Sequence, residues 1–156
     1  MTAIVANNFN YGMTGGQFSP VTPEKSVTST SRAGTVLPPM DICSLAEVAG
    51  ASYVARSTVY HVTELQRTLK EAIRKKGFSL VEVLTNCPTY YGRYNRIGDG
   101  PGMMEWLKQH TVPLSKYRTL PPAEQEKVYW RGCLVDRERP DFITRYRELA
   151  VGGDES

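Results

Sequence analysis

The chain has 156 residues, of which 40% are hydrophobic and 22% are charged, and its formal net charge is +3. These values are ordinary for one folded domain with a real core. The small net charge, with basic residues spread along the chain, argues against a nucleic-acid-binding protein. No apolar run approaches the ~18 residues that a membrane span needs, so we expect no membrane association.

The cysteine content indicates the cellular compartment in which the protein works. The three cysteines, Cys43, Cys87 and Cys133, form no C-x-x-C pair. An odd number of cysteines without a recognisable secretory signal indicates a reducing environment rather than a disulfide framework. We therefore expect a cytoplasmic protein.

The chain opens with the short apolar run TAIVA at residues 2–6, which predicts a buried strand of a parallel sheet. Either a second chain supplies the neighbours of this strand, or the chain is a truncated or split product. An Asn- and Gly-rich stretch follows at Asn7–Pro23, where ligands of open α/β sheets bind. Asn oxygens and nearby carbonyls suit Mg²⁺, and glycines let the backbone approach a ligand. The alternative is an ordinary turn after a strand.

The middle of the chain predicts alternating helices and strands. Residues 18–40 predict a long loop rich in Pro, Ser and Thr, of the kind that forms lids or mobile linkers. Asp41 predicts the cap of a short helix that runs to Ala49 and stops at Gly50. Residues 53–56 then predict the next strand.

A second helix and strand follow. Thr63 and Gln66 have the spacing of a capping box, and Gly77 predicts the end of the helix. Residues 78–84 predict a strand, so strand, helix and strand form a right-handed βαβ unit. The one charged residue within this strand, Glu82, lies at the end of the sheet or pairs with a nearby arginine.

The rest of the chain predicts short elements joined by polar connectors. In order, these are a turn at 98–100, a helix at 101–109, a connector at 113–122, one helical turn at 123–127, an edge strand or extended arm at 129–135, a short helix from 139 to 149 and a disordered tail at 151–156. We expect a first domain at 1–112 and a C-terminal extension at 113–150 that packs on the core or on a partner.

Three segments resemble, in order, the thiamine-diphosphate-binding beta subunit of 2-oxoacid:ferredoxin oxidoreductases, the 2-oxoglutarate type in particular. They are NNFNYGMTGGQFSPVTP at Asn7–Pro23, KGFSLVEVLTNCPTYYGRYN at Lys76–Asn95 and RGCLVDRERPDF at Arg131–Phe142. The resemblance covers nearly the whole chain. It implies an α/β fold of three layers around a mostly parallel sheet, with the N-terminal part and its Gly-Asp-Gly magnesium motif missing. The Gly-Asp-Gly at 98–100 follows the Asn pair instead of preceding it, so we interpret it as a turn.

The resemblance also implies metal ligands. Asn8 would give its side-chain oxygen to Mg²⁺, and Asn10 would give its carbonyl. Cys87, in the C-P-T motif, would be one of four cysteine ligands of a [4Fe–4S] cluster whose other ligands lie outside this chain. Taken alone, a cysteine before a proline is more often a buried small hydrophobe. Cys43 and Cys133 match no ligand position of the family.

The remaining cofactor contacts that the resemblance implies lie in the same loop. Tyr11, Gly12 and Thr14 would line the diphosphate and the thiazolium end of thiamine diphosphate. Met13 would lie near the substrate or under the cofactor ring. Gly15 stands where some relatives have a lysine that binds a substrate carboxylate, so the sequence leaves the particular 2-oxoacid open.

The implied reaction is the oxidative decarboxylation of a 2-oxoacid, 2-oxoglutarate being favoured, to an acyl-CoA with electrons passed to ferredoxin. The alpha subunit would be the partner and would supply the Glu that activates the cofactor, so we assign no catalytic residue to this chain. One alternative is a non-catalytic fragment that serves as an assembly partner. Another is a different thiamine-diphosphate-dependent decarboxylase, against which Cys87 argues because that chemistry needs no cluster.

Overall fold

The computed structural model describes residues 1–152, with side chains described to residue 150. The expected disordered tail at 151–156 lies outside the described residues except for 151 and 152, which end a helix. Among the described residues, no helix combines the length and the apolar character that crossing a membrane requires.

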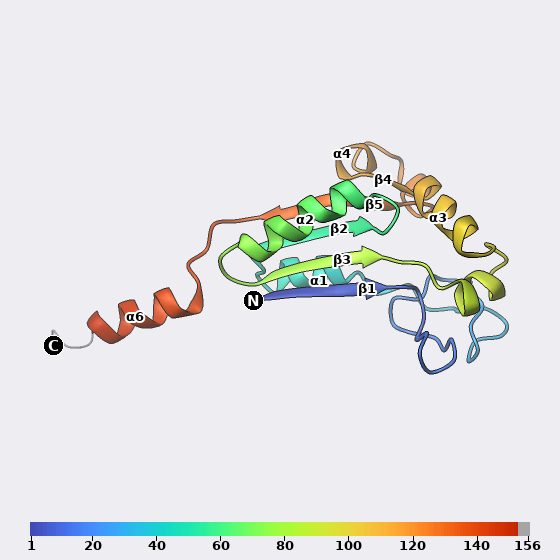
Figure 1. The fold of residues 1–156 in the computed structure, drawn as a ribbon, viewed down its shortest axis with the longest axis horizontal. Coiled ribbons are helices and arrows are strands. Elements are labelled where there is room, and N and C mark those ends of the chain that lie inside the picture. Colours follow the sequence, from blue (N-terminus) through green and yellow to red (C-terminus); the bar gives the residue numbers. More distant parts are fainter. Residues whose placement is uncertain (153–156) are drawn as a thin grey trace.

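Five strands form one sheet in the order β1-β3-β2-β5-β4 (Figure 1). The strands are β1 (Thr2–Asn7), β2 (Tyr53–Thr58), β3 (Ser79–Leu84), β4 (Thr111–Pro113) and β5 (Tyr129–Asp136). β3 runs parallel to both β1 and β2, whereas β5 is antiparallel to β2 and parallel to β4. The prediction of a mostly parallel sheet is therefore confirmed.

The helices are α1 (Ile42–Val48), α2 (Val62–Arg74), a π-helical turn η1 (Pro88–Gly92), α3 (Gly100–Gln109), α4 (Leu114–Tyr117), α5 (Pro122–Gln125) and α6 (Phe142–Gly152). α1 and α2 cover opposite faces of the sheet (Figure 1). Ala72 of α2 packs in one core cluster with Val81 and Val83. Cys43 of α1 packs in another with Val54. The predicted three layers are thus present.

The helix starts show one prediction that is confirmed and one that is wrong. The Asp41 side chain accepts hydrogen bonds from the backbone N–H groups of Cys43 and Ser44, at 3.1 and 3.3 Å, and so caps α1 as expected. No capping box forms at α2, because His61 takes the N-cap position and its side chain makes no capping bond to the helix backbone. The Thr58 hydroxyl turns the chain there instead, since it accepts from the His61 N–H at 3.2 Å.

The prediction that residues 129–135 form an edge strand or arm is wrong. β5 pairs with β2 through its second half and with β4 through its first half. Trp130 and Val135 are buried in the core beneath α1. The position of β5 inside the sheet follows from these two long-range pairings, which local sequence does not show. The proposed division of the chain at residue 113 stays a prediction, although β5 joins the same sheet as β2.

The long loop at 18–40 has no helix or strand, as predicted, but hydroxyl groups fix it in place. The Ser26 hydroxyl lies 2.9 Å from the Tyr91 hydroxyl. Asn95 accepts from the Val27 N–H at 2.7 Å and donates to the Val27 carbonyl at 3.0 Å. These bonds tie the loop to η1 and the segment after it, so its abundant Ser and Thr residues serve packing rather than mobility.

Candidate functional site

The loops that follow β1 and β3 leave the sheet side by side. Asn7 is in register with Leu84, and the Thr85 N–H donates to the Asn7 carbonyl at 2.8 Å. Both chains then continue at the same end of the sheet, where the Asn7–Pro23 loop and η1 lie (Figure 1). The parallel β1–β3 pair therefore confirms that the segments carrying the Asn residues and Cys87 share one edge.

Three of the predicted site residues converge around a fourth, Gly12. A methyl group built on Gly12 would lie 3.0 Å from Asn8 Nδ2, 3.7 Å from Cys87 Sγ and 3.9 Å from Asn10 Oδ1. Gly12 therefore keeps a space open between the three side chains. A larger residue would fill the position at which these donors and acceptors meet.

The side-chain amide of Asn10, unpaired among the described residues, is free to bind a ligand held beside Gly12. Asn10 is 6% exposed, and neither its Oδ1 nor its Nδ2 has a hydrogen-bond partner within the described part of the chain. An unpaired buried amide costs about 1–3 kcal/mol, so such a group points to a role beyond packing. Asn8 Oδ1 accepts from the Asn10 backbone N–H at 3.4 Å, which links the Asn8 side chain to the main chain of Asn10. Amide and carbonyl oxygens are ligands that Mg²⁺ accepts.

Three other predicted contacts do not join this group. Tyr11 is 54% exposed and Met13 is 99% exposed. The Thr14 hydroxyl donates to Gln17 Oε1 at 2.7 Å within the same turn. Gly16 closes that turn with a φ of +78°, and a side chain there would come within 2.7 Å of Tyr90. In this structure, the side chains of Tyr11 and Met13 therefore face solvent and the Thr14 hydroxyl is bonded within the turn, so none of the three joins Asn8, Asn10 and Cys87.

Phe9 anchors the chain between the two Asn residues. It is fully buried with a φ of +67°, a conformation that non-glycine residues rarely adopt. Its ring packs against Tyr91 and Tyr129, with centroids 5.0 and 5.6 Å away, and edge-on against Trp106 at 5.7 Å. The left-handed backbone lets this ring enter the core while Asn8 and Asn10 remain beside Gly12.

A buried charged cluster lies on the α1 face of the same edge. Arg56 Nε donates to Glu82 Oε2 at 2.5 Å, and Arg56 Nη2 donates to Asp41 Oδ1 at 2.9 Å. The second Glu82 oxygen, Oε1, accepts from Asn7 Nδ2 at 2.7 Å. The pairing of Glu82 with an arginine is one of the two alternatives predicted from the sequence.

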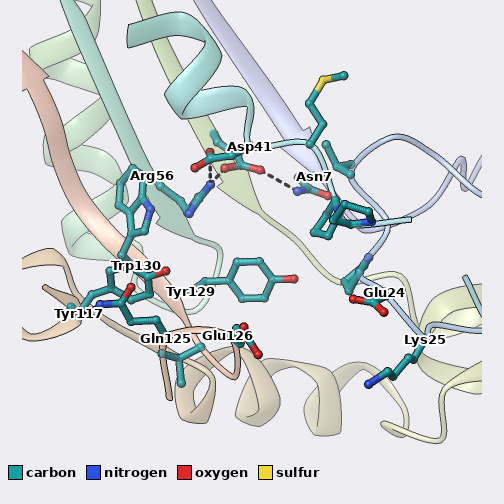
Figure 2. A pocket seen from close by; sticks show the side chains of 17 residues that line it. Asn7, Glu24, Lys25, Asp41, Arg56, Tyr117, Gln125, Glu126, Tyr129 and Trp130 are labelled. Atoms are coloured by element: carbon teal, nitrogen blue, oxygen red, sulfur yellow. Dashed lines mark hydrogen bonds and ion pairs between the residues drawn. The ribbon is translucent and has the colours of Figure 1, made fainter. Parts of the chain in front are cut away.

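A cavity of about 560 Å³ borders this charged cluster. Figure 2 shows Asn7, Asp41 and Arg56 pointing toward one another at one side of it and the Tyr129 ring pointing into it. The guanidinium carbon of Arg56 lies 4.2 Å from the ring centroid of Trp130. The cavity thus joins a charged wall to an aromatic one.

Local electrostatics favour the charged forms of Arg56 and Asp41. Burial lowers the pKa of Arg56, but the charges of Glu82 and Asp41 together with the hydrogen bond to Glu82 outweigh it, so the pKa of Arg56 is raised. Burial raises the pKa of Asp41, but hydrogen bonds from Ser44 and the charge of Arg56 outweigh it and lower that pKa. Burial raises the pKa of the Cys43 thiol, which stays protonated and therefore unreactive.

Sequence reasoning did not assign Arg56 or Asp41 to this cluster. The available signal was Glu82 itself, because a carboxylate inside an apolar strand needs a partner. Its partner on β2 became identifiable only with the β2–β3 register, which places Arg56 beside Glu82. Among the described residues, no group of three or more His, Cys, Asp or Glu side chains could hold a metal ion.

The fold and this edge define a cofactor-binding α/β domain, and comparison with known proteins identifies its family. Residues 1–83 match the model of the thiamine pyrophosphate enzyme, C-terminal TPP binding domain. The match covers more than half of the chain, so the chain belongs to this family. Thiamine pyrophosphate is the same compound as thiamine diphosphate.

Individual relatives identify a narrower group of proteins than the family model does. The chain is 40% identical to the 2-oxoglutarate synthase subunit KorB of Methanocaldococcus jannaschii over 149 residues, which is 96% of this chain and 55% of that protein. It is 53% identical to the subunit of the same name from Archaeoglobus fulgidus over 90 residues, 58% of this chain and 34% of that protein. The resemblance to 2-oxoacid:ferredoxin oxidoreductase beta subunits is thus confirmed. The chain spans about half the length of the curated relatives it matches.

A solved structure shares the fold. The 2-oxoglutarate:ferredoxin oxidoreductase from Magnetococcus marinus, solved with 2-oxoglutarate, coenzyme A and succinyl-CoA bound, superposes with a TM-score of 0.74. It is 21% identical in sequence, and the match covers 97% of this chain and 53% of that one. At this identity the likeness shows the fold.

Proposed function

We propose that the chain forms part of the cofactor site in a 2-oxoacid:ferredoxin oxidoreductase that oxidatively decarboxylates 2-oxoglutarate to an acyl-CoA. The observation that carries the proposal is the convergence of Asn8, Asn10 and Cys87 around Gly12 at the carboxyl edge of the sheet. Relatives that match most of this chain are named 2-oxoglutarate synthase subunits, which supports the choice of substrate.

The roles proposed for the individual residues are those that the resemblance to the family implies. Asn8 would give its side-chain oxygen to Mg²⁺ and Asn10 its carbonyl, and Gly12 would leave room for the diphosphate. Bound thiamine diphosphate would supply a nucleophilic carbon for the 2-oxo group and an electron sink for the decarboxylation, while Asn8, Asn10 and Gly12 would hold it in place. We propose Tyr11, Met13 and Thr14 as further cofactor contacts, made where their solvent-facing turn meets the bound cofactor or a partner chain.

Cys87 is proposed as one ligand of a [4Fe–4S] cluster whose other ligands come from outside this chain. It is 9% exposed and sits at the edge of the aromatic cluster that contains Phe9. Electrons would pass from the iron–sulfur cluster to ferredoxin. The further protein partner in this proposal is an alpha subunit, which supplies the activating Glu, and the complex is cytoplasmic. Coenzyme A and the 2-oxoacid are its substrates.

The test is calorimetric titration of thiamine diphosphate with Mg²⁺ into the chain alone and into the chain co-produced with the chains encoded beside it. We expect binding in the mixture. Asn8→Leu should abolish it and Asn8→Asp should perturb it, because Leu removes the oxygen ligand whereas Asp keeps an oxygen but adds a negative charge. Gln109→Leu is the matched control, since it replaces an exposed amide on α3 and should leave binding unchanged.

The outcomes separate the alternatives. Unchanged affinity in Asn8→Leu would remove the metal assignment. No binding in either preparation would favour a non-catalytic assembly partner. Cofactor binding in a complex without iron at Cys87 would favour a decarboxylase that passes no electrons to a cluster.

A further inference from the structure

We propose that Glu82 is a positioning residue that acts through Asn7 to hold the turn carrying Asn8 and Asn10. This inference rests on the proposed function, because it concerns the same cofactor edge. Asn7 and Glu82 both lie outside the set of residues that the sequence predicts to contact the cofactor. The competing explanation is that Glu82 is a buried ion-pair partner of Arg56 and contributes only to folding.

The first step is that Glu82 is held rigidly. Its side chain is 3% exposed and that of Arg56 is 8% exposed. The two lie opposite one another on the adjacent strands β3 and β2. Arg56 is itself held on its other side by Asp41. A carboxylate fixed in this way between strands provides a stationary acceptor at the end of β1.

The second step is that Asn7 connects this acceptor to the turn. Its Nδ2 donates to Glu82 Oε1 at 2.7 Å, and its Oδ1 accepts from the Phe9 N–H at 2.9 Å. A carboxylate can only accept and a backbone N–H can only donate, so these two partners fix which way the Asn7 amide faces. Without Glu82, the amide would lose the bond that orients its oxygen toward Phe9.

The third step is that Phe9 needs such support. Its positive φ is a strained conformation for a residue with a side chain. Its N–H is held by Asn7, and its carbonyl accepts from the Thr22 hydroxyl at 2.7 Å. The turn is therefore held at both ends of one residue, with Asn8 immediately before it and Asn10 immediately after it. Loosening Phe9 would move both proposed ligands.

The test separates positioning from stability. The double variant Arg56→Met/Glu82→Leu removes the ion pair without leaving a buried unpaired charge, so it should fold. It still removes the acceptor of Asn7. Asn7→Ala keeps the ion pair but breaks the link to Phe9. Glu64→Gln is the matched control, because it disrupts another half-buried pair, with Arg131, that does not touch this turn.

Two measurements are made on these variants. The first is hydrogen exchange of the Phe9 amide in the full chain labelled with ¹⁵N-phenylalanine, which gives four backbone signals. We expect Phe9 to exchange about tenfold faster in the double variant and in Asn7→Ala. The Phe18 amide is the internal control, because it donates to the Thr30 hydroxyl elsewhere in the loop. It should not change.

The second measurement is the Mg²⁺ dissociation constant at saturating thiamine diphosphate, in the chain co-produced with the chains encoded beside it. Mutation of a residue that orients a metal ligand typically weakens metal affinity by about 10–100-fold. We expect at least about tenfold weaker Mg²⁺ binding in both turn variants and the parent value in Glu64→Gln. Mg²⁺ affinity within about twofold of the parent in the folded double variant would overturn the positioning role.

The two measurements also distinguish the failure of this inference from failure of the proposed function. If the parent complex binds no Mg²⁺ and cofactor, the proposed function fails and the metal part of this inference fails with it. The Phe9 amide then still decides whether Glu82 holds the turn. An unchanged Phe9 exchange rate in both turn variants would overturn that link even where the parent binds the cofactor normally.

Discussion

The two faces of the sheet differ in what they require of their residues. On the α2 face, Val81 and Val83 pack with Ala72 and need only an apolar shape of the right volume. On the α1 face, Glu82 is equally buried but bonds to Arg56 and Asn7. Val81 and Glu82 are neighbours in the chain and point to opposite faces of β3.

Packing on the α2 face therefore serves stability, whereas pairing on the α1 face also organises the site. An apolar face tolerates exchange among hydrophobic residues as long as volume is kept. A charged face tolerates only changes that keep donors and acceptors paired, because an unpaired buried charge costs several kcal/mol. The following predictions test this contrast between the faces.

The largest effect should follow a charge placed on the α2 face. Val81 is fully buried in a hydrophobic cluster with Ala55, Ala72 and Val83. Val81→Asp should cost more than about 4 kcal/mol of unfolding free energy and leave the chain unfolded. Val81→Ile is the control and should fold. Circular dichroism and urea denaturation would check both, and a cooperatively folded Val81→Asp would contradict the apolar assignment.

A smaller effect should follow from breaking the charge pair on the α1 face. Arg56→Met leaves Glu82 buried without its counter-ion and should destabilise the chain by about 3–5 kcal/mol. Adding Glu82→Leu removes the orphaned charge and should restore most of that loss. Urea denaturation of the parent, the single variant and the double variant measures the recovery. If the double variant is as unstable as the single one, the contrast between the faces does not hold.

The smallest effect should be a pH dependence at Asp41. The pKa of Asp41 is lowered in the folded chain. Its contribution to folding stability is therefore fully present above the pKa of Asp in the unfolded chain, which is about 4, and is lost as the pH falls through the lower folded pKa. Asp41→Asn keeps a capping side chain but has no titrating group. Its stability should therefore fall less than that of the parent between about pH 5 and pH 3, by under about 1 kcal/mol because Asp41 is partly exposed. Parallel acid titrations of both chains provide the check.

Much of the fold could be predicted from local patterns. The strands β1 and β3 read as continuous apolar runs, and Asp41 and Gly50 mark the ends of α1 because caps and left-handed residues act locally. The failures at α2 and β5 have a common cause. The Thr58 side chain competes with the expected cap of α2, and β5 is placed by pairing with β2 and β4, far away in the sequence.

The candidate site also has residues that the local sequence indicates and residues whose role depends on the tertiary structure. Asn8, Asn10, Gly12 and Cys87 were recognisable from their segments and lie together. Which side chains of the first loop turn toward solvent depends on Phe9, whose positive φ no sequence pattern revealed. The roles of Arg56 and Asn7 depend on strand register, because neither residue is unusual until Glu82 lies beside it.

The unpaired side of β1 has a consequence for handling and assembly. Among the described strands, the two edges of the sheet are β4, which is three residues long and ends in a proline, and β1, which has six residues. Short edges and proline resist the addition of further strands, whereas a longer open edge is a template for them. Ile4, on β1, is 53% exposed. The same row of backbone groups can therefore pair with a second copy when the chain is concentrated or with a strand of another chain, so its solubility and its capacity for assembly are linked.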